Sequence, residues 1–92
     1  MNKINVEFNG GESRQNPRVA CDYMIAKTEI DGEKIELYAE VLIDEFCEEH
    51  DLDYYTDDLE AEDLIYQQLR DEIVEQAKEH GILENALHFI WD

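Results

Sequence analysis

The amino-acid sequence predicts an α+β fold, in which a small antiparallel β-meander of about three strands packs against two α-helices. Three observations support this fold class: apolar residues alternate with period two in the first half, an Asp-Gly pair separates two of the alternating runs, and a helical apolar stripe occupies residues 61–77. A chain of 92 residues can bury one core, so we expect a single domain over residues 1–92.

The first strand is expected over residues 4–8, where apolar and polar residues alternate, and the turn sequence Asn9-Gly10-Gly11 ends it. A polar loop over residues 12–17 then leads to a second alternating run that begins at Val19. In this run Cys21 and Tyr23 share one face with Val19, and the intervening residues form the other. We therefore predict a second strand from Val19 onward.

The pair Asp31-Gly32 predicts a tight hairpin, because both residues tolerate positive φ, and the return strand begins at Lys34. The end of this strand is ambiguous in the sequence. Residues 35–43 fit period two, whereas residues 39–50 also fit a helical stripe. We expect the strand to give way to a helix at residues 38–40 and the helix to end near His50.

A second helix is expected after an acidic loop, and Thr56, Asp57 or Asp58 can cap its N-terminus. Its buried stripe has the spacing of one helix face and consists of Ala61, Ile65, Leu69, Ile73 and Ala77. Gly81 is a suitable stop for this helix. Residues 82–91 are apolar, and we expect them to dock on the fold as a short helix or an edge strand.

The charge is strongly negative and unevenly distributed. The chain has 25 acidic and 7 basic residues, a net charge of −18, and residues 44–63 hold 11 acids with no Lys or Arg. Such a balance excludes direct binding to nucleic acid or to an anionic membrane through the protein's own charges. The two cysteines, Cys21 and Cys47, make no disulfide framework, and there is no signal peptide or membrane span, so we expect a cytoplasmic protein.

The acidic segment is the candidate partner-binding site. Carboxylates four residues apart on a helix are separated by about 6 Å of axial rise, close to the spacing of phosphates along a nucleic-acid strand. Tyrosines among carboxylates also form an aromatic anchor with a polar rim, which suits a basic protein surface. The alternative is a solvated face that only keeps the chain soluble. The candidate residues are Glu48, Glu49, Asp51, Asp53, Tyr54, Tyr55, Asp57, Asp58, Glu60, Glu62 and Asp63, with the row Asp71, Glu75 and Glu79 as a second choice.

Catalytic, metal and cofactor motifs are weak throughout the chain. Asp51, Asp53, Asp57 and Glu62 match four positions of a calcium loop, but Thr56 replaces the required glycine and Tyr55 offers no carboxylate. Cys47 and His50 have zinc-ligand spacing without a second pair nearby. There is no glycine-rich phosphate loop. We expect no enzymatic activity, no catalytic residues, no metal and no cofactor.

The layout and charge resemble those of small acidic anti-CRISPR proteins that inhibit Cas9. The resemblance rests on Ile30-Asp31-Gly32-Glu33, on Leu42-Ile43-Asp44-Glu45-Phe46 and on the acidic run from Glu48 to Asp63. In that class an acidic surface occupies a basic protein channel and excludes the target DNA. The resemblance implies that this chain inhibits a Cas effector or a restriction enzyme by DNA mimicry, as a phage-type factor in the host cytoplasm.

A second resemblance competes with the first. Asp51-Leu52-Asp53-Tyr54-Tyr55 is similar to the Asp-Leu-x-Tyr-Tyr stretch with which colicin-type immunity proteins bind their toxin nuclease. Those proteins are four-helix bundles, whereas residues 18–38 here predict a hairpin. The alternatives to DNA mimicry are therefore an immunity protein or antitoxin that caps a basic nuclease, and a non-catalytic acidic interaction subunit.

Overall fold

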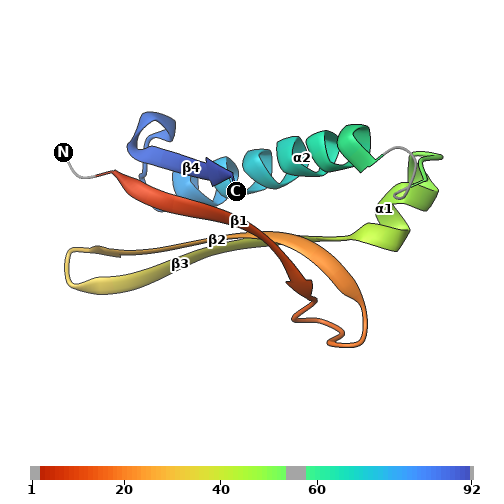
Figure 1. The fold of residues 1–92 in the computed structure, drawn as a ribbon. Coiled ribbons are helices and arrows are strands. Elements are labelled where there is room, and N and C mark those ends of the chain that lie inside the picture. The colour runs from red at the N-terminus through yellow and green to blue at the C-terminus, as the bar shows by residue number, and fades with distance from the viewer. Residues whose placement is uncertain (1–2, 54–57, 92) are drawn as a thin grey trace.

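The computed structural model describes residues 3–53 and 58–91, and it confirms the α+β class (Figure 1). Four strands form one sheet in the order β3-β2-β1-β4, and a long helix lies along one side of it. The elements in chain order are β1 (Ile4–Glu12), β2 (Ala20–Ile30), β3 (Glu33–Leu42), α1 (Ile43–Glu49), α2 (Asp58–Glu79), a 3₁₀ turn η1 (Glu84–Ala86) and β4 (Leu87–Trp91).

The hairpin between β2 and β3 forms where the Asp-Gly pair predicted it. Ile30 pairs with Glu33, and the two residues between them have positive φ, 52° at Asp31 and 81° at Gly32. Positive φ at both central residues gives the turn the twist that antiparallel strands require. Nine more antiparallel residue pairs follow, down to Cys21 and Leu42.

The strand β1 continues through the glycines that the sequence predicted to be a turn. Gly10 and Gly11 pair with Asp22 and Cys21 of β2, and the connecting loop covers residues 13–19 instead of 12–17. A β-carbon on Gly10 would lie 3.2 Å from Oδ1 of Asp22. The lack of a side chain at Gly10 therefore makes room for a neighbouring carboxyl group inside the sheet.

The transition from strand to helix was predicted too early. The strand β3 extends to Leu42 and α1 begins at Ile43, not at residues 38–40. Ala39 and Val41 are both 6% exposed on the side of the sheet that α2 covers, so the period-two pattern describes this segment and the helical pattern does not. Pairing with β2 decides between the two, because it satisfies the backbone hydrogen bonds of β3 along its whole length.

The C-terminal segment turns the predicted meander into a mixed sheet. After η1, β4 runs parallel to β1, with Ile4 paired to Leu87 and Val6 paired to Phe89. Leu87 is 6% exposed, so the segment covers the edge of the core that β1 would otherwise leave open. The sheet therefore has four strands rather than three, and the tail is an edge strand.

The core lies between the sheet and α2. The predicted stripe of α2 is confirmed, since each of its residues is 0% exposed: Ala61, Ile65, Leu69, Ile73 and Ala77. These side chains pack on inward-facing residues of the strands, among them Val6, Met24 and Leu37. Past the end of the helix, Gly81 has a φ of 74°, the conformation of a helix stop. One helix thus presents a single apolar stripe to the sheet and its remaining surface to solvent.

Candidate functional site

The predicted acidic residues gather at the end of the molecule where α1 is joined to α2 (Figure 1). Eight carboxylate side chains with described positions are exposed there: Asp44, Glu45, Glu48, Glu49, Asp51, Asp53, Glu60 and Asp63. Asp58 is the first residue of α2. The predicted site residues Tyr54, Tyr55 and Asp57 lie outside the described part of the chain. Residues 44–63 contain no Lys or Arg, so no cation within this segment neutralises its carboxylates.

Glu62 differs from its neighbours, because it is half-buried and acts on a carboxyl group of the sheet. Asp22 of β2 is only 6% exposed, and its Oδ2 has no hydrogen-bond partner among the described residues. Burial, with a smaller contribution from the charge of Glu62, raises the pKa of Asp22 to about 6. Asp22 was not among the predicted site residues, although it lies two residues before the inward-facing Met24 and therefore on the same face of β2.

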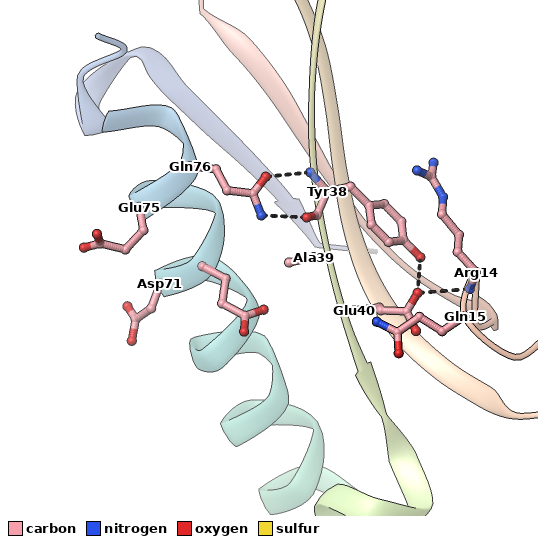
Figure 2. Close-up of a pocket in the computed structure, with 9 residues that line it drawn as sticks. Arg14, Gln15, Tyr38, Ala39, Glu40, Asp71, Glu75 and Gln76 are labelled. Carbon is pink, nitrogen blue, oxygen red and sulfur yellow. Dashed lines mark hydrogen bonds between the residues drawn. The ribbon is translucent and has the colours of Figure 1, made fainter. Parts of the chain in front are cut away.

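A second acidic feature is a groove of about 670 Å³ between α2 and the edge strand β3 (Figure 2). The wall formed by α2 carries three exposed carboxylates, those of Asp71, Glu72 and Glu75. Burial raises the pKa of Glu72, so this carboxyl group is already partly withdrawn from water. The opposite wall consists of β3 and the start of the loop after β1.

The floor of the groove is fixed by Gln76, whose amide bonds to the edge of β3. The backbone N–H of Tyr38 donates to Oε1 of Gln76 at 3.0 Å, and Nε2 of Gln76 donates to the carbonyl oxygen of Tyr38 at 2.7 Å. Both backbone polar groups of Tyr38 are thereby satisfied by one side chain, as Figure 2 shows. The acidic row of α2 is thus held at a set distance from the sheet.

The opposite wall is held by a network around Glu40. Its carboxylate accepts hydrogen bonds from the hydroxyl of Ser13, the backbone N–H of Arg14 at 3.0 Å and the hydroxyl of Tyr38 at 3.0 Å. Burial alone would raise the pKa of Glu40, but these donors outweigh it and lower the pKa below its usual value. Burial, helped by Glu40, raises the pKa of Tyr38 to about 12. The network keeps Glu40 ionised and Tyr38 neutral.

Arg14 is the one cation that the described residues contribute to this wall, and its charge is already engaged. Its guanidinium lies 3.8 Å from the centre of the Tyr38 ring and 2.7 Å from a carboxylate oxygen of Glu36. No sequence signal could identify this network, because it joins loop residues to β3 residues 22 to 27 positions away. The α2 wall of the groove therefore stays negative, since the exposed Lys78 approaches one of its three carboxylates, that of Glu75, at 3.7 Å.

The described ranges 3–53 and 58–91 contain residue types that can bind a metal ion or act as nucleophiles. No group of three or more His, Cys, Asp or Glu side chains could hold a metal ion there. Cys21 and Cys47 are buried, and burial, with the charges of Glu40 and Asp22, raises the pKa of Cys21. A raised pKa reduces the thiolate fraction and with it the nucleophilicity of that sulfur. The chemistry that this surface offers is the binding of cations.

Comparisons place the chain beside no known protein. No model of a known protein family, no curated protein sequence and no solved structure matches it. Within the described residues, none of the helices has the length and apolar composition that crossing a membrane requires. The function is therefore argued from the acidic surface itself.

Proposed function

We propose that this protein inhibits a nucleic-acid-binding protein by occupying its basic channel with an acidic surface that mimics DNA. The partner class is a Cas effector or a restriction enzyme, and the proposed place of action is the host cytoplasm. The observation that carries the proposal is the set of exposed carboxylates on α1 and α2, which form one group within residues 44–63 and a second group within residues 71–79.

The dimensions of α2 support mimicry. Its 22 residues extend about 33 Å, nearly the ~34 Å of one turn of B-DNA. Along the exposed side, Asp71, Glu75 and Glu79 follow one another at about 6 Å of axial rise. Lys78 approaches Glu75 at 3.7 Å, but this exposed pair leaves the row strongly negative. This row covers about 12 Å of the helix axis, and its three carboxylates can bind two or three phosphate-binding side chains at once.

The energetics of such a complex depend on arginine and lysine side chains of the partner that normally hold phosphates. Charge-assisted hydrogen bonds between those cations and the carboxylates replace their contacts with phosphate oxygens. Electrostatic steering makes association fast at low salt, and screening slows it as ionic strength rises. The tyrosines Tyr54 and Tyr55 remain the proposed aromatic anchor of the interface.

A displacement assay tests the proposal. A Cas9–guide complex, a restriction enzyme and a colicin-type DNase are each loaded with fluorescent duplex DNA, and the protein is titrated in at low and high salt. We expect displacement from the Cas effector or the restriction enzyme that weakens at least tenfold between about 0.05 M and 0.5 M NaCl. Displacement from the DNase alone indicates an immunity protein. If all three enzymes keep their DNA at low salt, mimicry of these targets is wrong.

Neutral variants locate the surface that is used. One variant changes Asp51, Asp53, Asp57 and Asp58 to Asn, and a second is Asp71→Asn with Glu75→Gln and Glu79→Gln. The control removes three exposed carboxylates of the strands and the hairpin, with Glu12→Gln, Asp31→Asn and Glu33→Gln. We expect one of the first two to lose at least tenfold in potency while the control keeps it. Equal loss in all three variants would mean that only net charge matters.

A further inference from the structure

The side of the sheet opposite α2, here called the outer face, is uncovered by any helix in the described part of the chain (Figure 1). Its centre is a row that crosses all four strands through Tyr38, Ile25, Glu7 and Ile90 in pairing register. The side chains of Tyr38, Ile25 and Ile90 are partly exposed. The centre of the outer face thus presents two isoleucines and one exposed carboxylate, that of Glu7, to solvent, beside the Tyr38 ring that Arg14 partly covers.

The charges on the outer face nearly balance, unlike those of the rest of the chain. In the sheet, Lys27 pairs across strands with Glu36, and Lys34 pairs with Glu29. With Arg14, Glu7 and Glu40 included, this face carries four carboxylates and three cations, whereas the whole chain has a net charge of −18. A surface on which both signs alternate is complementary to a copy of itself.

The stacking of the layers in such a dimer keeps the repulsion between the two acidic α2 helices small. Two sheets that pack face to face are about 10 Å apart, and each helix layer lies about 10 Å beyond its own sheet. The two acidic helix layers are then about 30 Å apart, well beyond the ~8 Å screening length at physiological salt.

The outer face is also large enough for a weak but specific interface. The four strands contain 35 residues, which at ~3.3 Å per residue and ~4.8 Å per strand cover roughly 550 Å² of plane. Standard interfaces bury about 800 Å² of accessible surface on each partner. A hollow of about 320 Å³, lined by Asn5, Glu7, Ile25 and Lys27, can receive side chains from the opposite sheet.

We propose that the outer face binds a second copy of this chain, giving a two-fold symmetric dimer in which the two sheets form a sandwich and the acidic helices face outward. Ile25 lies near the symmetry axis, and Lys27 of each copy lies opposite the carboxylates of the other. The dimer presents two acidic surfaces, so this inference goes beyond the proposed function and does not depend on it.

Sedimentation velocity tests the proposal over a range of protein concentrations, at about 0.05 M and 0.5 M NaCl. We expect dimers with half-association below about 100 µM at the higher salt. Association should weaken at the lower salt, because the net charges of the two chains are then less screened. This is the opposite of the salt dependence expected for binding to a basic partner. A chain that stays monomeric at several hundred micromolar in high salt overturns the proposal.

Two variants on the outer face and two controls identify the surface. Lys27→Glu and Ile25→Thr should each weaken dimerisation at least fivefold. Lys78→Glu changes the net charge by the same amount as Lys27→Glu but lies on α2, and Val74→Thr makes a comparable polar change there. Both controls should dimerise like the parent chain. Circular dichroism melts confirm that each variant is folded, and a dimer that both outer-face variants leave intact contradicts the assignment.

Discussion

Replacing the buried Asp22 by Asn should stabilise the protein at neutral pH. Asp22 is 6% exposed, and burial followed by the charge of Glu62 raises its pKa from 3.8 to about 6. A shift of about 2 units corresponds to about 3 kcal/mol of folding free energy, at 1.36 kcal/mol per unit. This cost is present when the carboxyl group is ionised in the folded state, that is, above pH 6.

The sign of the pH dependence follows from linkage. Between pH 3.8 and about 6 the folded state holds a proton at Asp22 that the unfolded state has released, so this group favours folding most below pH 3.8. Its contribution is lost as the pH rises through about 6. The neutral amide of the Asp22→Asn variant is free of this dependence, although an unsatisfied amide still costs about 1–2 kcal/mol. We therefore expect Asp22→Asn to gain about 1–2 kcal/mol at pH 7 and to lose about 1 kcal/mol at pH 4, where the parent carboxyl group is protonated in the folded state.

Urea unfolding followed by far-UV circular dichroism at pH 4, 5, 6 and 7 measures this difference. A gain of 1–2 kcal/mol corresponds to a melting shift of roughly 4–16 °C for a domain of this size. Glu62→Gln is the matched control, because it removes the smaller cause of the shift and should give a smaller gain in the same pH window. A difference between Asp22→Asn and the parent that does not vary from pH 4 to pH 7 would refute the reasoning.

Three further predictions concern packing, the edge of the sheet and metal ions. Leu69→Ala should lower the free energy of unfolding by about 2–5 kcal/mol in urea titrations, because Leu69 is 0% exposed at the centre of the α2 stripe. A loss below about 1 kcal/mol would contradict this packing. Gln76→Ala should cost about 1–2 kcal/mol and speed amide hydrogen exchange at Tyr38. Unchanged exchange there would rule out the hydrogen bond that the Tyr38 N–H donates to Gln76. Calcium should raise the melting temperature no more than magnesium does, because Tyr55 and Thr56 stand where a calcium loop needs a carboxylate and a glycine. A rise in melting temperature with calcium alone would refute this.

The fold was predictable where the signal is local. Asp31-Gly32 determines the hairpin through its own φ preferences, and the stripe around Leu69 determines the buried side of α2 through helical spacing alone. The segment at Ala39 and Val41 fits both periods, and only its pairing with β2 decides the outcome. The parallel pairing of β4 with β1 likewise depends on contacts between the two ends of the chain.

The candidate site was predictable in composition but not in arrangement. The acidic run is visible in the sequence, and the structure places its exposed carboxylates together at one end of the molecule. Asp22 was missed because one acid within a strand is typical of a solvent-exposed position, and its burial follows from the packing of α2. The groove beside Tyr38 was missed because its walls come from three separate segments of the chain.

The amide of Gln76 has a consequence for how the protein behaves at high concentration. An exposed edge strand is a template to which other chains can add, and such addition leads to cross-β aggregation. At Tyr38, near the middle of β3, the side chain of Gln76 occupies the donor and the acceptor that an incoming strand would use. The remaining stretches of this edge are too short for a long in-register ladder. The same helix that displays the acidic row therefore also blocks strand addition at the middle of the β3 edge.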